Sequence, residues 1–272
     1  MEKEIKTLMF EKEELLEMTP SPLMIERKES EGDVAVIILL YKNPAFERTL
    51  KPYEIEIMGK KMWKWIELGA GEYPVKTCVI TPETDIISAI KPILTEKKYT
   101  LVFYSDTPLI TKTTIDEIVT YMRSRDCGAI NLVRGYAFNT EYLKEIDSIQ
   151  NDIVVKICKE DFLQAKDFKS IELITSIIKE NILNFHLENG VHIQDKNSVI
   201  IEADVIIESA VTIEPFNEIK GKTYIGKQTT LEMGNRILDC IIGDNVILRN
   251  SYLKNCKIDN NKVIGPFEKI EN

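Results

Sequence analysis

Aliphatic residues recur at every sixth position through the last third of this chain. The uninterrupted series consists of Ile201, Ile207, Ile213, Ile219, Ile225, Leu231 and Ile237. A period of six fits neither the 3.6-residue turn of an α-helix nor the two-residue alternation of an ordinary strand. It is typical of a solenoid with a triangular cross-section, in which each hexapeptide forms one side and its aliphatic residue points inward. The sequence therefore predicts a left-handed parallel β-helix, and a set of ordinary antiparallel strands is the disfavoured alternative.

The six-residue count shortens to five at Ile242, Leu253 and Ile258. We expect these steps to shorten a corner without moving aliphatic side chains out of the core. The whole segment would then contain roughly four coils. Three glycines each follow an inward-pointing residue directly, namely Gly226, Gly243 and Gly265. We expect them to adopt corner backbone angles that other residues avoid.

The composition excludes several classes of protein. A net charge of −9 provides no basic face for neutralising nucleic-acid phosphates. The chain has no apolar signal core at its start and no apolar run of membrane-spanning length. Its five cysteines form no CxxC pair or disulfide framework, which suits a reducing compartment. We therefore expect a cytoplasmic protein that binds neither nucleic acid nor membranes.

The first two thirds of the chain alternates apolar runs with amphipathic segments. Strands are expected over 34–40, 76–80 and 101–104. Helices are expected over 62–68, 86–94, 113–125 and 170–184, the third capped by Thr113 or Thr114. The run Val34–Leu40 is apolar throughout, as in strands buried on both faces of a parallel sheet. This alternation predicts a parallel α/β sheet with helices on both faces, and such sheets bind ligands at the carboxyl ends of their strands.

Four stretches of the sequence together resemble one known family. They are ILDCIIGDNVI from Ile237, VIGPFEKI from Val263, LVFYSDTPLI from Leu101 and GKKM from Gly59. They are similar to segments of the bifunctional UDP-N-acetylglucosamine pyrophosphorylase/glucosamine-1-phosphate acetyltransferase, and the chain resembles a shortened, diverged member. The resemblance implies a reduced nucleotidyltransferase-like α/β domain with a connecting helix over 32–190. A β-helix would follow over 191–272, and an N-terminal helical extension would precede both over 1–31.

The resemblance also implies a metal site. Asp106 matches the family's carboxylate after a strand end, where it would hold Mg²⁺ beside substrate phosphates. The structural alternative is a loop residue that caps a turn. The family's second ligand is an asparagine that opens the connecting helix, and Phe168 stands there. Asp167 could replace it only if the start of the helix shifts.

The substrate-binding loops depart from the family pattern. The family's glycine-rich phosphate loop is replaced by YKNPAF from Tyr41, so Lys42, Arg48 and Lys51 are the remaining candidates for phosphate contacts. Pro82 and Glu83 stand where the resemblance would place the uracil-reading Gly-Thr pair. A single match to the sugar-binding asparagine remains.

That match is Asn131, which is followed by Leu132 and Val133 rather than by the family residues. The chain also lacks about forty residues between Asp106 and Asn131 that the resemblance would require. Because phosphoryl transfer depends on positioning and charge stabilisation, these losses predict weak or absent catalysis.

Acetyl transfer, the second family activity, is not expected for this chain. Solenoid acyltransferases need a histidine as general base, and the only candidates are His186 and His192, at the entry to the first coil. We expect a packing or surface role for both.

Three hypotheses follow from the resemblance. The favoured one is a nucleotide-sugar-binding or assembly protein related to UDP-N-acetylglucosamine synthesis, with UTP or a UDP-sugar as ligand. The alternatives are an active uridylyltransferase for N-acetylglucosamine-1-phosphate and a purely structural trimeric scaffold. A homotrimer through the β-helix and a full-length family enzyme are the implied protein partners.

Overall fold

The computed structural model describes residues 32–41, 52–149 and 159–271, and they form two compact units. The division lies between Thr175 and Ser176, inside the long helix α6 (Phe168–Glu188). The expected boundary between residues 190 and 191 lies just beyond the end of the same helix. Within the described ranges, helices that could cross a membrane are absent.

Several expectations concern residues outside the described ranges. The N-terminal helical extension over 1–31 is one of them, and the candidate phosphate contacts Lys42, Arg48 and Lys51 are the others. They remain predictions.

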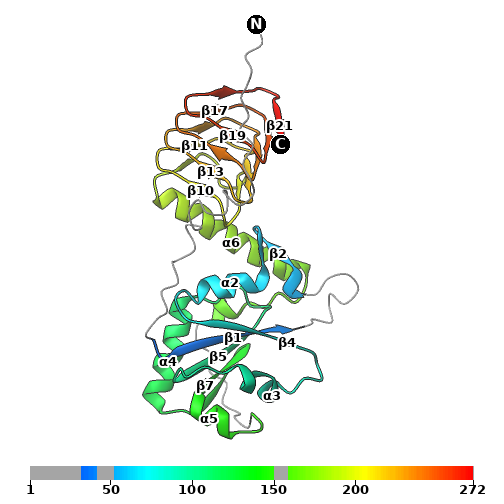
Figure 1. Ribbon diagram of the computed structural model, residues 1–272, viewed down its shortest axis with the longest axis vertical. Coiled ribbons are helices and arrows are strands. Elements are labelled where there is room, and N and C mark those ends of the chain that lie inside the picture. The colour runs from blue at the N-terminus through cyan, green and yellow to red at the C-terminus, as the bar shows by residue number, and fades with distance from the viewer. Residues whose placement is uncertain (1–31, 42–51, 150–158, 272) are drawn as a thin grey trace. The chain divides into compact units, whose positions relative to one another are not determined.

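A five-stranded mixed sheet forms the centre of the first unit (Figure 1). Its strands, in their order across the sheet, are β4 (Val75–Ile80), β1 (Val34–Tyr41), β5 (Tyr99–Tyr104), β7 (Gly135–Asn139) and β6 (Ala129–Leu132). The first three are parallel to one another. Strand β7 runs antiparallel to both of its neighbours, and a tight hairpin connects it to β6. The expected parallel α/β sheet is confirmed, with β7 as its one antiparallel strand.

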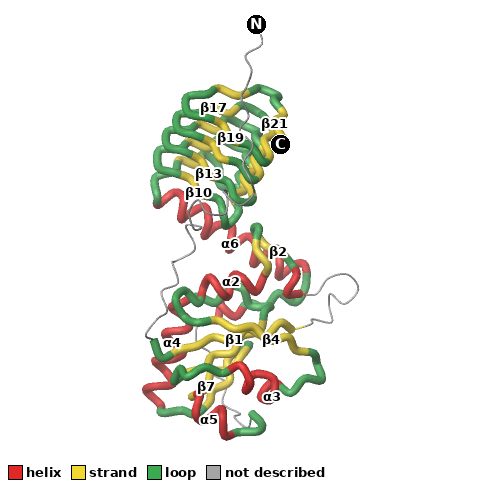
Figure 2. The backbone as a smooth tube through the Cα atoms, in the orientation of Figure 1, coloured by secondary structure: helices red, strands yellow, loops and turns green. Residues whose placement is uncertain are grey.

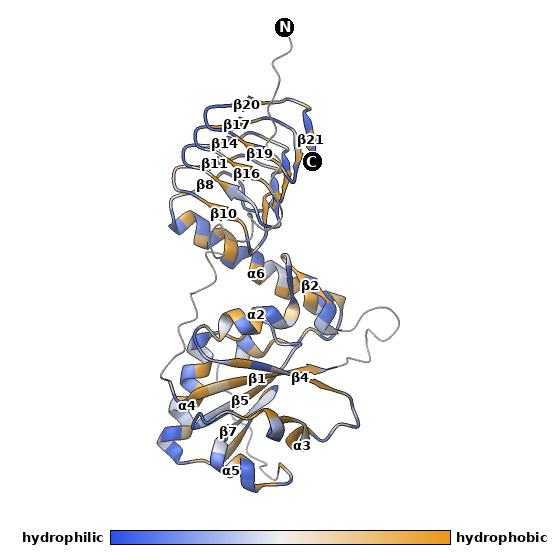
Figure 3. Ribbon diagram, in the orientation of Figure 1, coloured by the Kyte–Doolittle hydropathy of each residue, from blue (hydrophilic) through white to orange (hydrophobic). Residues whose placement is uncertain are grey.

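Helices cover both faces of this sheet, as its apolar strands predict. Strand β1 is hydrophobic along its length (Figure 3). Its side chains alternate between two cores, with Val36 and Ile38 in one and Ile37 and Leu39 in the other. Helices α2 (Met62–Gly69) and α4 (Lys112–Arg125) pack in the first core, and α3 (Ile86–Ile90) and α5 (Thr140–Glu145) pack in the second.

Three helix bounds differ from the expected ones for local reasons. Helix α4 is capped by Thr111, whose hydroxyl accepts a hydrogen bond from the Thr114 backbone N–H, so neither Thr113 nor Thr114 is the cap. The predicted 86–94 helix ends early and continues as a 3₁₀ turn, η3 (Lys91–Ile93), which contains Pro92. Helix α6 begins earlier than expected because Asp167 caps its start. It also ends later than expected.

Short elements complete the first unit. They are η2 (Pro52–Glu54), the antiparallel pair β2 (Glu56–Ile57) and β3 (Lys60–Lys61), and η4 (Lys159–Phe162). Phe162 packs in the first core against the Phe103 ring, with 6.1 Å between the ring centroids. This contact attaches the segment that precedes α6 to the sheet.

The second unit is the predicted parallel β-helix, whose short strands alternate with turns (Figure 2). One sheet contains β8 (His192–Ile193), β11 (Thr212–Ile213), β14 (Thr230–Leu231), β17 (Ile247–Leu248) and β20 (Val263–Ile264). Another contains β9 (Ile200–Ile201), β12 (Glu218–Lys220), β15 (Arg236–Leu238), β18 (Tyr252–Lys254) and β21 (Lys269–Glu271). The third contains β10 (Ile206–Ile207), β13 (Tyr224–Ile225), β16 (Ile241–Ile242) and β19 (Lys257–Ile258).

The strand register confirms the six-residue count and its shortened steps. Ile219 pairs with Ile237, Ile237 with Leu253, and Leu253 with Ile270. Successive coils therefore differ in length by one or two residues, while the inward position stays aligned. The inward aliphatic side chains from Ile201 to Ile264 are buried, as predicted.

Two of the three glycines that were expected at corners lack the expected backbone angles. Only Gly265 has a positive φ, of 91°, whereas Gly226 and Gly243 do not. A Cβ on Gly226 would lie 2.4 Å from Asp244 Oδ1, and one on Gly243 would lie 2.3 Å from Asn260 Oδ1. These two glycines therefore permit close stacking of coils rather than unusual backbone angles.

Positive φ angles instead occur in three columns, one at each corner. The columns are Ala210, Gln228, Asn245 and Asn261; Phe216, Gly234, Asn250 and Phe267; and Gly221, Asp239 and Asn255. Most of their backbone N–H groups donate to carbonyls of the preceding coil, as Asn245 N does to Lys227 O at 2.8 Å. Asparagine and aspartate tolerate this left-handed conformation better than most residues.

A buried asparagine ladder lines one edge of the β-helix core. Asn235 Nδ2 donates to Asn217 Oδ1 at 3.0 Å, and Ser251 N donates to Asn235 Oδ1 at 3.0 Å. On another edge the Sγ atoms of Cys240 and Cys256 lie 3.6 Å apart. Polar side chains in this core are thus paired between neighbouring coils.

Candidate functional site

The candidate site lies at the carboxyl end of β5, the middle strand of the sheet. After Tyr104 the chain turns through three buried polar residues, Ser105, Asp106 and Thr107. Ser105 N donates to Leu39 O of β1 at 2.9 Å, and the Thr107 hydroxyl donates to Tyr104 O at 2.9 Å. These bonds fix the turn so that Asp106 stands at the sheet edge where open α/β folds bind ligands.

Both carboxylate oxygens of Asp106 accept hydrogen bonds from other side chains. Arg134 donates from Nε to Oδ1 at 3.2 Å and from a terminal nitrogen to Oδ2 at 2.8 Å. Gln164 Nε2 also donates to Oδ2, at 2.8 Å. The Asp106 side chain is 2% exposed and that of Arg134 is 25% exposed. Asp106 is therefore a buried anion neutralised by a two-pronged ion pair.

The antiparallel strand β7 brings Arg134 to this position. Gly135 pairs with Phe103 across β5 and β7, so the hairpin residue before it lies beside the end of β5. A Cβ on Gly135 would lie 2.3 Å from Val102 O, and its φ is 142°. Glycine is therefore required where the hairpin returns close to β5.

Two aromatic rings border the guanidinium. The Arg134 Cζ lies 3.9 Å from the centroid of the Tyr104 ring and 5.5 Å from that of Tyr41. The two rings meet edge to face, with 5.7 Å between centroids. Such contacts favour the cation and hold its plane in place.

The Tyr104 hydroxyl also contacts the hydroxyl of Tyr136, a third tyrosine beside Arg134's ring contacts. Burial raises the pKa of the Tyr104 hydroxyl, and the neighbouring Tyr136 hydroxyl raises it further. Tyr104 therefore remains a neutral hydrogen-bonding group at physiological pH. It is unsuited to act as a general base.

Asp167, the second candidate metal ligand, caps the start of helix α6. Its Oδ1 accepts the Ser170 backbone N–H at 2.7 Å. Hydrogen bonds from the Ser170 backbone and hydroxyl lower the pKa of this carboxyl. Helix α6 begins at Phe168, directly after Asp167.

Asn131, the candidate sugar contact, lies half-buried on β6 and pairs with Tyr136 of β7. The two side chains that contact Asp106, Arg134 and Gln164, were not predicted from the sequence. The short turn between the apolar runs Ala129–Leu132 and Tyr136–Phe138 would have indicated the hairpin, and with it the position of Arg134. Gln164 carried no comparable signal.

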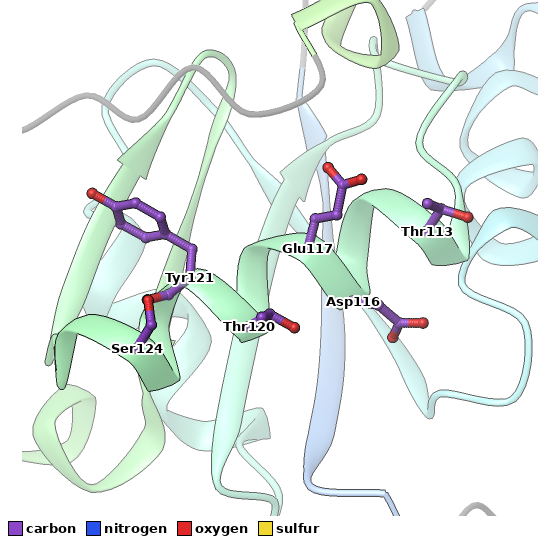
Figure 4. A pocket seen from close by; sticks show the side chains of 6 residues that line it. All are labelled: Thr113, Asp116, Glu117, Thr120, Tyr121 and Ser124. Atoms are coloured by element: carbon purple, nitrogen blue, oxygen red, sulfur yellow. The ribbon is translucent and has the colours of Figure 1, made fainter.

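Two hollows flank helix α4 and offer no comparable chemistry. The larger, about 550 Å³, is lined by α4 side chains alone, including Thr113, Glu117 and Tyr121 (Figure 4). The smaller, about 210 Å³, lies at the amino end of β1 and includes Asp33 and Arg123. Neither lies at the carboxyl edge of the sheet.

The two histidines of the second unit differ in environment. His186 in α6 is buried, and burial lowers its pKa to about 4. His192 begins β8 and is exposed. These positions agree with the expected packing and surface roles.

Comparison with known proteins points to one group of relatives. The chain is 32% identical over 111 residues to the bifunctional protein GlmU of Streptococcus thermophilus, covering 41% of this chain and 24% of that protein. It is 38% identical over 94 residues to GlmU of Clostridium botulinum, covering 35% and 21%. It is 28% identical over 155 residues to GlmU of Clostridium acetobutylicum, covering 57% and 34%.

The matches span about a fifth to a third of the length of these relatives. No family model matches the chain. The reduced α/β unit followed by a β-helix is the architecture that the resemblance implied. The chain is therefore similar to the bifunctional GlmU proteins over part of their length.

Proposed function

We propose that this protein binds a nucleotide sugar, with UDP-N-acetylglucosamine or its precursor UTP as the first candidates, and that its catalytic activity is weak or lost. The proposal rests on the similarity to GlmU and on the state of Asp106. We place the ligand at the carboxyl edge of the sheet, beside Tyr104 and Arg134.

The single observation that supports a loss of catalysis is that both carboxylate oxygens of Asp106 are hydrogen-bonded to side chains. Mg²⁺ bound to a carboxylate leaves a net charge of +1 to face a pyrophosphate leaving group. The Arg134–Asp106 pair leaves a net charge of zero. One missing charge at 4 Å costs about 4 kcal/mol at the effective dielectric near a protein surface. A barrier higher by that amount slows the reaction by roughly a thousandfold.

Ligand binding itself survives this change. Tyr41 and Tyr104 present aromatic rings beside a partly exposed guanidinium. Aromatic faces stack on nucleobases, and guanidinium groups bind phosphates. This combination supports recognition of a nucleotide without supplying the charge that turnover needs.

The test is a calorimetric titration of the purified protein with UTP and with UDP-N-acetylglucosamine. A separate assay measures pyrophosphate release from UTP in the presence of N-acetylglucosamine-1-phosphate and Mg²⁺. We expect saturable heat with at least one ligand and no release above background. Asp106→Asn should weaken binding because it removes the anchor of Arg134. Glu145→Gln, at an exposed carboxylate ending α5, should leave binding unchanged.

Other outcomes identify the alternatives. Pyrophosphate release that Asp106→Asn abolishes would establish an active uridylyltransferase. Absence of heat from folded protein would instead favour a structural scaffold. For assembly, we propose a homotrimer through the β-helix, with a full-length GlmU as candidate partner. Light scattering coupled to gel filtration would detect a mass other than three chains.

A further inference from the structure

We propose that Arg134 is the resident cation of this site and takes the place of Mg²⁺ at Asp106, so that the diphosphate of a ligand binds without metal. The identity of the ligand rests on the proposed function. The exclusion of metal rests only on the residues around Asp106.

The donor set at Asp106 does not fit a divalent cation. Both oxygens are directed at N–H donors, Oδ1 at Arg134 and Oδ2 at Arg134 and Gln164. A metal would have to displace the guanidinium from the carboxylate oxygens of Asp106. Because the displaced guanidinium would remain nearby, the two cations would compete for one buried carboxylate. Gln164 directs its NH₂ group at the carboxylate. An amide NH₂ group is a hydrogen-bond donor and not a metal ligand.

The ion pair is held from several sides. Asp106 is fixed through its own backbone, since Ala165 N donates to Asp106 O at 2.8 Å. Arg134 is fixed by the β6–β7 hairpin and by the ring of Tyr104 at 3.9 Å. A planar, stacked guanidinium in two-pronged contact with a carboxylate is already oriented before any ligand arrives.

Further metal ligands are not gathered around Asp106. The carboxylate of Asp167 caps α6 through Ser170. Across residues 32–41, 52–149 and 159–271, no three His, Cys, Asp or Glu side chains form a group that could hold a metal ion. Within the described residues, Asp106 therefore belongs to no group of three such side chains that could hold an incoming cation together.

Arg134 can still contact an anion. The pair with Asp106 uses Nε and one terminal nitrogen of a group that carries five N–H donors. A quarter of the side chain remains exposed. A phosphate can therefore bind the outer edge of the guanidinium while the inner edge keeps Asp106.

The experiment measures Mn²⁺ binding by the electron paramagnetic resonance of the free ion, with no nucleotide present. Five proteins are compared: wild type, Arg134→Gln, Arg134→Lys, Asp106→Asn and the double variant Asp106→Asn/Arg134→Gln. We expect Arg134→Gln to bind Mn²⁺ about tenfold more tightly than wild type, and the double variant to lose this gain. Arg134→Lys, which keeps a cation, should behave as wild type, and circular dichroism checks the fold of each protein.

A second measurement concerns the ligand. The dissociation constant of wild type for UDP-N-acetylglucosamine should agree within about twofold between EDTA and excess Mg²⁺. Absence of nucleotide-sugar binding would defeat the proposed function, while the Mn²⁺ comparison would still decide the role of Arg134. Wild-type Mn²⁺ binding that Asp106→Asn removes, or no gain in folded Arg134→Gln, would overturn the inference.

Discussion

The buried histidine of α6 makes the stability of this protein depend on pH in a calculable way. His186 is 2% exposed, and its Nδ1 has no hydrogen-bond partner within the described residues. Burial lowers its pKa to about 4, from an ordinary value of 6.5. The folded state therefore keeps the imidazole neutral, whereas the unfolded chain takes up a proton as the pH falls below 6.5.

The sign and size follow from proton linkage. Because the unfolded state binds more protons between pH 6.5 and 4, the free energy of unfolding falls as the pH decreases through this window. The slope approaches about 1.4 kcal/mol per pH unit. Over the whole window the loss amounts to about 3 kcal/mol, and the contribution is fully present above pH 6.5.

Urea unfolding between pH 4 and 8 measures this effect, with His186→Gln as the test variant and His192→Gln as the exposed control. We expect the difference in unfolding free energy between wild type and His186→Gln to change by about 3 kcal/mol across the window. Far-UV circular dichroism should detect it in the β-helix transition. Fluorescence of Trp63 and Trp65, both on α2, follows the other unit and serves as an internal control. A pH-independent difference would refute the reasoning.

Two further predictions concern the β-helix. Asn235→Ala should lower the free energy of unfolding by about 3 kcal/mol, because it leaves the buried Ser251 N without its acceptor and removes the Nδ2 bonds to Asn217 Oδ1 and Glu232 O. Urea unfolding beside the outward-facing control Thr230→Ala checks this, and an equal effect of both would contradict it. Gly226→Ala should lower the melting temperature and cost about 2 kcal/mol, because the added Cβ meets Asp244 Oδ1 at 2.4 Å. The neighbouring Lys227→Ala, at an exposed side chain, should not, and unchanged melting of Gly226→Ala would show that adjacent coils can separate without cost.

The β-helix could be predicted from the sequence almost residue by residue, because one periodicity determines both the strand register and the core. Every inward position from Ile201 to Ile264 follows from counting. The corner geometry did not follow. Non-glycine residues such as Asn245 and Phe267 adopt the positive φ angles, since hydrogen bonds to the preceding coil fix the turn whatever residue occupies it.

The α/β unit was predictable as a class and less so in detail. Val34–Leu40 signalled a buried strand, but no local pattern showed that β7 would insert antiparallel beside β5. That pairing decides the site, because it places Arg134 on Asp106. The family-based prediction of a metal site at Asp106 named Asp167 as the possible second ligand. The hydrogen bonds to the Asp106 carboxylate come from positions 28 and 58 residues further along the chain, which no local pattern around Asp106 indicates.

The unequal coil lengths of the β-helix indicate which insertions and deletions this segment can accept during evolution. Ile219, Ile237, Leu253 and Ile270 remain stacked although the coils between them have lost one or two residues at corners. Loss of a single corner residue is therefore neutral for the core. Loss of a whole hexapeptide would move each later strand to the next of the three sheets and exchange all outward-facing surfaces. Length changes in such a segment should therefore accumulate either one residue at a time at corners or as complete coils.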